Sequence, residues 1–509
     1  MHPSAKATKQ ARDPRYDFAT ETIPVSLPAE DSIDHVPLVV DLDGTLIATD
    51  TLLEGALRVL KQEPRSLLQL GTWLVQGKAV LKAAVAHHSP LNAETLPYRP
   101  AVLEFLQAQR LQGRKIVLAT AAHQSTAYAV AVHLGLFDEV IASTDTDNLK
   151  GRRKRDALIQ RFGIRGFDYI GDARADIPVW SVCRTAYAAG HMSSVPRAAL
   201  VDGSKQGGSF ATPRADLRTW VRLMRVYQWV KNLLVFIPAF LNHSIDLTSL
   251  KSVLVTFFAF SFVASGTYIF NDLFDLESDR KHPRKCKRPL AAGEISITQG
   301  VVMAHLLLLG GLLMGASIGL VLVLCLLTYF ALTSLYSAFL KRKPVLDVIT
   351  LAMLYTVRVY SGGLVSGAYV SPWLFQFSIF FFLSLAFVKR YSELRRLRYQ
   401  RQFDAPGRGY RLGDLSIISQ AGIGSGMIAG LVLALYINAQ ELQRTYPHPH
   451  MLWGVCPLFI YWIVRVWLVA HRGNMQEDPI LFAFHDRVSY IVGSLIVAAV
   501  ILGLTPYAS

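Results

Sequence analysis

The sequence predicts a multidomain fold in which a parallel α/β domain precedes an all-α bundle of nine transmembrane helices. Up to about residue 215, short apolar runs that end in acidic residues, glycine or a hydroxyl alternate with helical patterns, as in a parallel α/β sheet. Beyond that point, windows of roughly 20 apolar residues recur, which is the length that spans a bilayer. A chain of 509 residues with 52% hydrophobic content is also too long and too apolar for one soluble core.

Composition along the chain divides it into four parts. Residues 1–34 are polar and contain several prolines, so we expect them to be disordered. Residues 35–202 form the α/β domain, with a mainly helical insertion at about 50–110. Residues 203–216 are rich in glycine and serine, which predicts a flexible linker. Residues 217–509 hold the membrane helices.

Reactive side chains follow the predicted strands of the α/β domain. An apolar run that begins at His35 ends in Asp41 and Asp43, and the next strand ends in Thr120. Ligands of parallel sheets bind at the carboxyl ends of the strands, so we expect these groups to lie together. The remaining members of the set are Lys154, which opens a helical stretch, and Asp172 and Asp176 after the third strand.

This set of groups suits phosphoryl transfer through an aspartyl-phosphate with Mg²⁺. Asp41 would attack phosphorus and Asp43 would protonate the leaving oxygen. Thr120 and Lys154 would hold the phosphoryl oxygens; Lys150 competes with Lys154, which we prefer because it leads directly into the helix. The expected metal ligands are Asp41, Asp43, Asp172 and Asp176.

The combination D-L-D-G-T-L, strand-end threonine, lysine and G-D-x-x-x-D resembles the haloacid dehalogenase-like hydrolases over about residues 36–202. The resemblance implies a Rossmann-like phosphatase domain whose helical insertion is a small cap that selects the substrate. One departure is Ala173-Arg174, where serine or asparagine is commoner after the aspartate; Arg174 either touches substrate or is a surface charge. The alternative is a degenerate domain that is kept for structure.

A charged segment, Asn271 to Gly293, follows the apolar window that ends at Phe270. On a continuous helix, Asp272, Asp275 and Asp279 share one face, and Asn271 lies one turn before Asp275. Carboxylates crowded on one face repel unless a cation lies among them, and oxygen ligands suit Mg²⁺ bridging to a substrate phosphate. The alternative is a solvated helix end whose acids pair with the basic run that follows, namely Lys281, Arg284, Lys285, Lys287 and Arg288.

The net charge of +15 indicates membrane topology rather than nucleic-acid binding, because Lys and Arg cluster at the ends of apolar windows. The loops after the even-numbered windows are basic and those after the odd-numbered windows are nearly free of Lys and Arg. We therefore place the N-terminal domain and the even loops in the cytosol and the C-terminus outside. The windows lie near 230–243, 252–271, 298–317, 319–340, 346–366, 372–389, 416–438, 451–470 and 488–507.

Further polar groups lie at the ends of these windows. Ionisable groups at membrane depth are costly and so indicate function by default, although groups at loop ends also act as topogenic anchors. The candidates are Gln228, Lys231 and Asn232 before the first window, Tyr336, Lys341 and Asp347 around the fourth loop, Lys389, Arg390, Tyr391 and Glu393 at the sixth, and Asp478 and Asp486 before the ninth.

The motif N-D-x-x-D-x-x-x-D at the end of the second window resembles the UbiA superfamily of intramembrane prenyltransferases over about residues 217–509. Within that superfamily the chain is most similar to the polyprenyl-phosphate phosphoribosyltransferases, the decaprenyl-phosphate enzyme being their best-known type. The matching pieces are Q-W-V-K-N from Gln228, the run from Asn271 to Gly293, K-R-Y-S-E-L from Lys389, and E-D-P-I-L-F-A-F-H-D-R from Glu477.

The resemblance implies transfer of phosphoribose from phosphoribosyl diphosphate to a polyprenyl phosphate in the bacterial inner membrane. Asn271, Asp272, Asp275 and Asp279 would hold Mg²⁺ on the diphosphate. Prenyltransferases that act on aromatics usually carry a second aspartate-rich motif where this chain has K-R-Y-S-E-L, and that exchange of acids for cations suits an anionic acceptor. The expected phosphate-binding groups are Lys285, Arg288, Lys341, Lys389 and Arg390.

The fusion suggests two steps, in which the N-terminal phosphatase removes the 5-phosphate of the first product to give polyprenyl-phosphoryl ribose. A tether raises the effective concentration of the second site. A homo-oligomer is possible. The main alternative is an aromatic prenyltransferase that uses a prenyl diphosphate beside a phosphatase of separate substrate. A lipid-binding or transport unit with a soluble sensor is the non-enzymatic alternative.

Overall fold

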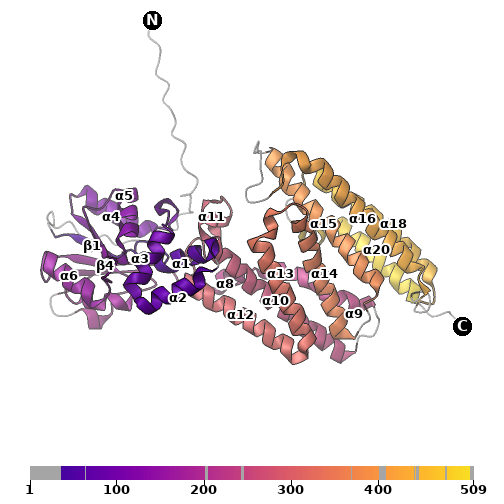
Figure 1. The fold of residues 1–509 in the computed structure, drawn as a ribbon, viewed down its shortest axis with the longest axis horizontal. Helices are drawn as coiled ribbons and strands as arrows, with labels where there is room; N and C mark the ends of the chain where they lie inside the picture. Colours follow the sequence, from indigo (N-terminus) through magenta and orange to yellow (C-terminus); the bar gives the residue numbers. More distant parts are fainter. Residues whose placement is uncertain are drawn as a thin grey trace, which may run out of the picture. The chain divides into compact units, whose positions relative to one another are not determined.

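The computed structural model groups the chain into two compact units, which we describe separately (Figure 1). The N-terminal unit comprises the chain up to Leu223 together with Asp272–Val301, and the membrane unit comprises Met224–Asn271 and Val302 onward. The segment 1–34, expected to be disordered, lies outside the described residues. The structure describes residues 36–63, 65–200, 204–241, 246–367, 370–399, 409–440, 442, 446–475 and 478–504.

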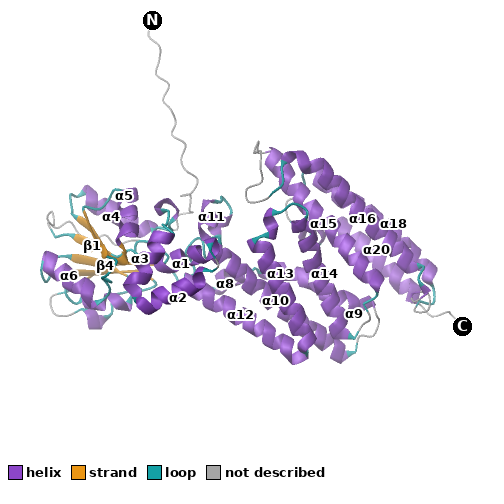
Figure 2. Ribbon diagram, in the orientation of Figure 1, coloured by secondary structure: helices purple, strands orange, loops and turns teal. Residues whose placement is uncertain are grey.

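The N-terminal unit contains one six-stranded sheet in the order β3-β2-β1-β4-β5-β6, with every neighbouring pair parallel (Figure 2). This arrangement confirms the predicted α/β fold. The strands are β1 (Leu38–Val40), β2 (Ile116–His123), β3 (Glu139–Ser143), β4 (Asp168–Gly171), β5 (Thr185–Gly190) and β6 (Lys205–Ala211).

Both faces of the sheet are buried, as the continuous apolar run of β1 requires. Leu38 and Val40 pack with α4 (Pro100–Leu111) and α5 (Gln124–Leu134) on one face. Val39 packs on the other face with residues of α6 (Arg152–Phe162) and α7 (Ile177–Trp180). The carboxyl end of β1 is therefore held firmly between two apolar layers, and this end carries Asp41.

Part of the segment predicted to be a flexible linker is the edge strand β6, so that prediction is wrong for Lys205–Ala211. One of the glycines that suggested flexibility, Gly207, serves close packing instead. A Cβ atom added at Gly207 would lie 2.5 Å from Cε1 of Tyr187, so only glycine lets the strand pass this ring.

The cap is shorter than the predicted insertion of about 50–110. It consists of α1 (Thr51–Gln62), α2 (Ser66–Gln76) and α3 (Lys78–His88), with Gly77, at a φ of +129°, separating α2 from α3. The helix α4 belongs to the core, because Val102 and Leu106 are fully buried against the sheet.

The segment Asp272–Val301 groups with the N-terminal unit, whereas the sequence had placed it in a membrane domain that begins at residue 217. The long helix α10 (Leu247–Phe274) ends within this charged segment. A short helix, α11 (Leu276–Lys281), and a 3₁₀ turn, η6 (Lys285–Lys287), follow it. The side chain of Arg222 in α8 (Leu217–Met224) forms an ion pair of 2.7 Å with Glu294 of this segment.

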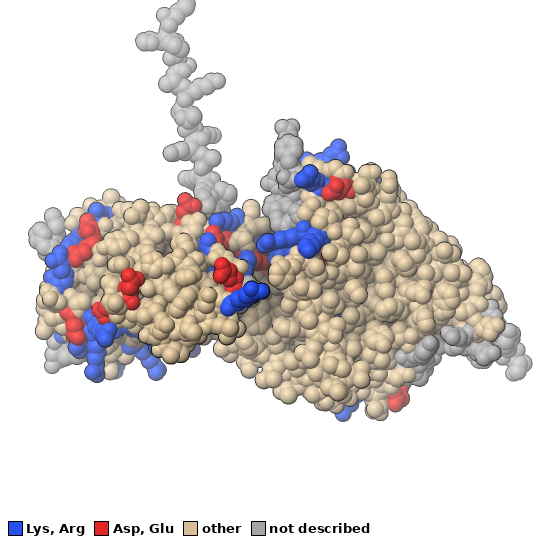
Figure 3. Space-filling model, in the orientation of Figure 1, with Lys and Arg blue, Asp and Glu red and all other residues tan. Residues whose placement is uncertain are grey.

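The described residues of the chain contain eight helices that are long and apolar enough to cross a membrane, one fewer than the nine predicted. The first predicted window is instead a 3₁₀ helix, η5 (Val226–Phe236), followed by the short α9 (Ile237–Leu241). Few charges appear on the helix bodies of this unit on the face drawn in Figure 3. The eight are α10, α12 (Ile297–Ile318), α13 (Leu320–Ala338), α14 (Leu346–Ser366), α15 (Pro372–Tyr399), α16 (Leu415–Ile437), α18 (Val455–Arg472) and α20 (Arg487–Leu504).

Small residues let the helices of the membrane unit approach one another closely, as is usual where lipid removes the hydrophobic driving force. A Cβ atom at Gly362 of α14 would lie 1.9 Å from the carbonyl oxygen of Val235. Gly422 of α16 likewise lies against Trp467, and its carbonyl oxygen accepts a 2.7 Å hydrogen bond from Ser384. These contacts fix the helices that carry the buried charged groups described below.

Candidate functional site

The first candidate site lies at the carboxyl ends of β1 and β4 in the N-terminal unit. Asp41 follows β1 directly, and its carboxylate lies 2.9 Å from Nζ of Lys154, which enters from α6. Both side chains are buried, whereas the competing Lys150 is exposed. Burial raises the pKa of Asp41, and the ammonium of Lys154 offsets only part of that rise.

Two further aspartates complete this site. Oxygen atoms of Asp41, Asp172 and Asp176 all lie within 4.8 Å of one another. The hydroxyl of Tyr169 donates a 2.8 Å hydrogen bond to Asp176 and accepts one of 3.0 Å from Lys154. Burial, together with the charges of Asp41 and Asp176, raises the pKa of Asp172 to about 7. A divalent cation would relieve this repulsion, so the three carboxylates fit the expected Mg²⁺.

Asp43 lies outside that group of three, and the cap holds its carboxylate. The backbone N–H and the hydroxyl of Thr51 donate hydrogen bonds of 2.9 Å and 3.1 Å to it. Burial, with a contribution from the charge of Asp50, raises the pKa of Asp43 to about 8. A carboxyl group that keeps its proton at neutral pH suits the predicted role of acid better than that of metal ligand.

Thr120 is buried within β2, three residues before the end of the strand, and its hydroxyl accepts a 3.0 Å hydrogen bond from the backbone N–H of Ala122. The hydroxyl of Thr45 donates a 3.1 Å hydrogen bond to Asp172. Arg174, which the sequence left open between a substrate contact and a surface charge, is exposed.

Two cations near this site were missed by sequence reasoning. Nζ of Lys82, on cap helix α3, donates hydrogen bonds to the carbonyl oxygen of Ala121 and, at 2.8 Å, to Asn148. Burial lowers the pKa of Lys82. Nε of Arg99 donates a 3.0 Å hydrogen bond to the carbonyl oxygen of Gly44 in the D-L-D-G-T-L motif. Neither cation belongs to a recognisable motif: the fold of the cap brings Lys82 here, and the start of the core helix α4 brings Arg99.

The second candidate site is the aspartate-rich segment of the N-terminal unit. Asp272 and Asp279 are buried, and Arg288 bridges them with contacts of 2.9 Å and 2.5 Å. Nζ of Lys285 lies 3.8 Å from Asp279. Asp272 and Asp279 therefore pair with the basic run that follows, as expected if this segment were a solvated helix end. Both carboxylates, however, are buried.

Asp275 departs from the predicted shared face because the helix breaks there. It is the N-cap of α11, and its carboxylate lies 2.6 Å from Nζ of Lys61 in the cap. Within the described residues, the carboxylates of 272, 275 and 279 do not converge as a group of three metal ligands. A Mg²⁺ ion held by all three would require a different local conformation.

Three ion pairs, which we call the α1–α11 pairs, join the cap to this segment inside the N-terminal unit. Besides Lys61 with Asp275, Arg58 contacts Glu277 at 3.0 Å and Glu54 contacts Arg280 at 2.6 Å. Glu54 and Arg280 are buried, and two hydrogen bonds, of 2.6 Å and 3.1 Å, join them. The cap thus contacts both the phosphatase core and the aspartate-rich segment.

The membrane unit contains a third group of charges around Asp478, the N-cap of α19 (Pro479–Ala483). Its carboxylate lies 2.9 Å from Nζ of Lys231 and 2.8 Å from Nζ of Lys389. Although burial opposes it, the two ammonium groups hold the pKa of Asp478 below its usual range. Two lysines on one carboxylate leave an excess positive charge, which suits an anionic ligand.

Arg390, predicted to bind phosphate, is fully engaged by protein groups. It forms ion pairs with Asp347 and Glu393, and it donates a 2.7 Å hydrogen bond to the hydroxyl of Tyr336. The hydroxyl of Tyr410 donates a further 2.6 Å hydrogen bond to Asp347. This geometry argues that Arg390 positions helices rather than binding substrate directly.

Other predicted groups of the membrane unit have mixed surroundings. Asn232 is buried and accepts a 2.7 Å hydrogen bond from Arg358, a buried cation of α14 that sequence reasoning missed. The hydroxyl of Tyr391 lies 2.9 Å from Nδ1 of His471. The side chains of Gln228, Asn271 and Lys341 are half-buried.

An apolar groove of about 710 Å³ lies between α15, α18, α19 and α20. Its walls are mainly aromatic and aliphatic, and α19 contributes Ala483. The same short helix therefore presents Asp478 at one end and a groove wall at the other. The side chains that form most of the walls are Phe377, Phe381, Phe459, Trp462, Phe484, Tyr490, Val497 and Ile501.

Comparison with known proteins shows similarity over nearly the whole chain. It is 37% identical over 478 residues to y4nM, an uncharacterised protein of Sinorhizobium fredii, covering 92% of this chain and 91% of that protein. It is 32% identical to the nodulation protein NoeC of Azorhizobium caulinodans, covering 54% of this chain and 89% of NoeC. It is 30% identical to decaprenyl-phosphate phosphoribosyltransferase of Corynebacterium glutamicum, covering 40% of this chain and 62% of that enzyme.

A solved structure of a UbiA homolog from Archaeoglobus fulgidus bound to GPP and Mg²⁺ matches with 20% identity and a TM-score of 0.44, covering 56% of this chain and 99% of that one. Residues 38–181 match the model of the haloacid dehalogenase-like hydrolases, and residues 233–488 match that of the UbiA prenyltransferase family. With eight apolar helices among its described residues, the chain is an integral membrane protein of the UbiA prenyltransferase family that carries an N-terminal haloacid dehalogenase-like hydrolase domain.

Proposed function

We propose that the UbiA-like part of the chain transfers 5-phosphoribose from phosphoribosyl diphosphate to a polyprenyl phosphate, and that the N-terminal phosphatase domain then removes the 5-phosphate. In the first step, a lipid phosphate oxygen bonds to the anomeric carbon of ribose as the bond to pyrophosphate breaks. In the second step, water supplies the oxygen that releases inorganic phosphate. The pairing of Lys231 and Lys389 on Asp478 is the observation that carries the choice of an anionic acceptor.

The acceptor phosphate requires positive charge that the protein has not already neutralised. Lys389 is about one-third exposed and shares its carboxylate with Lys231, so its ammonium has capacity for a further anionic oxygen. Arg390 instead holds Asp347 and Glu393, and so fixes the helix from which Lys389 projects. The similarity to an enzyme named for decaprenyl phosphate supports the same acceptor class.

The polyprenyl chain would occupy the apolar groove beside α19. A long isoprenoid tail needs a continuous apolar surface, and aromatic side chains supply much of the groove wall. Asp478 lies at the start of α19 and Ala483 at its end. A lipid could therefore place its phosphate beside Lys389 and its tail in the adjacent groove.

The donor diphosphate would use the aspartate-rich segment with Mg²⁺. In a local conformation that brings their side chains together, Asp272, Asp275, Asp279 and Asn271 are the proposed ligands of that ion, which would supply charge neutralisation for the departing pyrophosphate. Arg288 and Lys285 already lie against two of these acids and would contact phosphate oxygens. Stabilising pyrophosphate as it leaves is the main electrostatic task of the step.

The geometry of the N-terminal site supports the proposed hydrolytic step. Asp41 would attack the 5-phosphate, and Asp43 would give its proton to the leaving ribose oxygen. Lys154 and Thr120 would hold the phosphoryl oxygens, and Asp172, Asp176 and Asp41 would bind Mg²⁺. The α1–α11 pairs support coupling of the two steps, because they join the phosphatase cap to the donor-binding segment within one unit.

The topology proposed from the loop charges places the N-terminal domain on the cytosolic side of a bacterial inner membrane, where both phosphorylated substrates are available. On this topology the C-terminus lies outside. A homo-oligomer remains part of the proposal without bearing on the chemistry.

A double-label experiment tests both steps. Phosphoribosyl diphosphate with a carbon label in ribose and a phosphorus label at the 5-phosphate is incubated with membranes and polyprenyl phosphate. We expect the wild-type lipid product to keep the carbon label and lose the phosphorus label, and the Asp41→Asn product to keep both. Asp156→Asn, an exposed aspartate of α6, is the matched control.

Two outcomes would overturn the proposal. Loss of the phosphorus label in the Asp41→Asn product as well would show that the Asp41 site does not carry out the hydrolytic step. Consumption of a prenyl diphosphate with an aromatic acceptor, without use of phosphoribosyl diphosphate, would instead support the aromatic prenyltransferase.

A further inference from the structure

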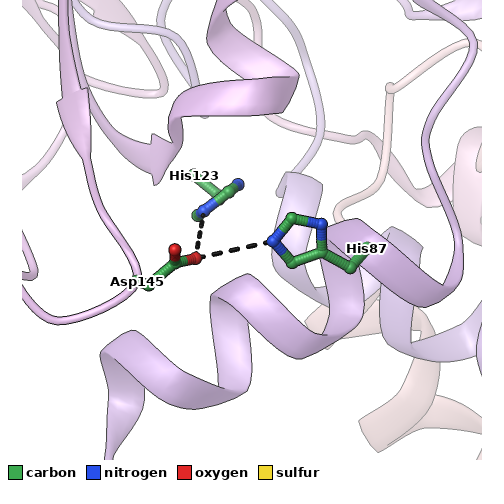
Figure 4. Close-up of side chains that lie close together, drawn as sticks. All are labelled: His87, His123 and Asp145. Carbon is green, nitrogen blue, oxygen red and sulfur yellow. Dashed lines mark hydrogen bonds and ion pairs between the residues drawn. The ribbon is translucent and has the colours of Figure 1, made fainter.

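Two histidines and an aspartate converge at the boundary between the cap and the core of the N-terminal domain (Figure 4). His87 lies in the last turn of cap helix α3, His123 ends core strand β2, and Asp145 lies in the loop after β3. In Figure 4 both imidazole rings direct a nitrogen at the Asp145 carboxylate. These residues take no part in the phosphoryl chemistry described above.

The spacing of the three donor atoms is that of a metal site. Oδ1 of Asp145 lies 3.1 Å from Nε2 of His123 and 3.5 Å from Nε2 of His87, and all three donors lie within 4.8 Å of one another. Two ligands each about 2.1 Å from a tetrahedral Zn²⁺ ion are about 3.4 Å apart. A separation of 3.5 Å is long for a hydrogen bond, so a hydrogen-bonded trio explains the contact of His87 less well.

The surroundings of His123 also suit a ligand. Its ring is buried, and its second nitrogen, Nδ1, lies 2.8 Å from the hydroxyl of Ser125. Donation of the Nδ1 proton to the Ser125 hydroxyl would fix the ring and leave Nε2 unprotonated for a metal, as is usual for histidines that bind metals. Acceptance by Nδ1 from the backbone N–H of Ser125, 3.3 Å away, would instead place the proton on Nε2. His87 and Asp145 are largely exposed, so an ion can reach the three donors from solvent.

We propose that His87, His123 and Asp145 bind a transition-metal ion of the Zn²⁺ class that clips the cap to the core. Two imidazoles and one carboxylate favour such an ion over Mg²⁺, which prefers oxygen ligands. Three protein ligands leave a coordination position open to water. Because β2 also carries Thr120, three residues before His123, the ion would fix the cap beside the strand that holds a phosphate-binding hydroxyl.

Metal binding by the full-length, tag-free protein in detergent tests the proposal. After removal of metals with a chelator, Co²⁺ is added in the presence of excess Mg²⁺, which occupies the carboxylate sites. We expect one tightly bound Co²⁺ with visible d–d absorption, displaced by Zn²⁺. His87→Ala and Asp145→Asn should each lower the affinity at least about 100-fold, and Ser125→Ala about 10-fold. His88→Ala, the neighbouring histidine of α3, should leave it unchanged.

A second measurement separates a metal clip from a hydrogen-bonded trio. Zn²⁺ should slow hydrogen exchange of α3 amides in the wild type and in His88→Ala, but not in His87→Ala. Equal Co²⁺ affinity in the wild type, His87→Ala and Asp145→Asn would overturn the proposal, as would the absence of a Co²⁺ ion that resists Mg²⁺. Neither readout depends on the lipid substrate or on phosphatase turnover, so failure here leaves the proposed function standing.

Discussion

Glu54 of the cap and Arg280 of the aspartate-rich segment form a buried ion pair joined by two hydrogen bonds of 2.6 Å and 3.1 Å. The guanidinium also donates a 3.1 Å hydrogen bond to the carbonyl oxygen of Ala291. Removing one partner of such a pair leaves a buried charge uncompensated, which typically costs about 3–5 kcal/mol. The pair therefore determines how firmly the cap and this segment are held together.

Arg280→Ala should destabilise the contact between α1 and the aspartate-rich segment by about 3 kcal/mol. Hydrogen exchange of α1 amides in the full-length protein measures the change. Arg58→Ala, on α1, is the matched control. The pair of Arg58 with Glu277 of α11 is about one-third exposed and should contribute less than about 1 kcal/mol. Equal effects of the two substitutions would show that the burial of Glu54 and Arg280 has no energetic consequence.

The metal-free N-terminal site should lose stability as pH rises. The pKa of Asp172 is raised from 3.8 to about 7 by burial and by the charges of Asp41 and Asp176. A carboxyl whose pKa is higher in the folded state contributes stability below pH 4 that is lost as pH rises to about 7. Addition of Mg²⁺ at pH 8 should raise the melting temperature more than addition at pH 5.

Asp172→Asn isolates that effect, since it removes one of the three carboxylates without changing the shape of the side chain. The variant should show a weaker pH dependence of melting temperature and a smaller response to Mg²⁺. Asp41 and Asp43 keep part of the pH dependence, and Asp41 and Asp176 keep part of the Mg²⁺ response. A Mg²⁺ response as large as that of the wild type would place the ion elsewhere. Asp156→Asn again serves as the exposed control.

The phosphatase site was accessible from sequence because each of its groups follows a strand or opens a helix. Parallel strands bring their carboxyl ends to one edge of a sheet, so Asp41 and Asp172 are placed together by topology alone. The sequence did not reveal Lys82 and Arg99, because neither belongs to a local motif. Only the folded cap brings Lys82 to Ala121. The convergence of His87 on Asp145 has the same origin.

For the aspartate-rich segment, by contrast, the sequence pattern predicted the wrong local structure. A continuous helix would align Asp272, Asp275 and Asp279, but α10 ends at Phe274 and Asp275 turns to Lys61. Lys61 is more than 200 positions away in sequence, so no periodicity could reveal this partner. Gly207 of β6 was misleading for a related reason, because it provides close packing against Tyr187 rather than flexibility.

Lys389→Ala should lower kcat/KM for polyprenyl phosphate by about 30-fold, the equivalent of roughly 2 kcal/mol for a hydrogen bond to a charged group. Lys389 lies 2.8 Å from Asp478 and is the more exposed of the two lysines there. Lys251→Ala, an exposed lysine at the start of α10, should have no effect. Initial rates at varied lipid concentration decide the matter, and an unchanged kcat/KM would remove Lys389 from the acceptor site.

Filling the apolar groove should weaken binding of long isoprenoid chains. Gly493 of α20 lines the groove, and a Cβ atom there meets no atom within 4 Å, so Gly493→Trp adds bulk without a clash at Cβ. We expect KM for a long polyprenyl phosphate to rise about 10-fold, the equivalent of roughly two buried methylene groups, with little change for a short isoprenyl phosphate. Gly424→Trp on α16 is the matched control, since its Cβ position is equally open and lies outside the groove. Equal KM values for the long lipid in both variants would show that the tail binds elsewhere.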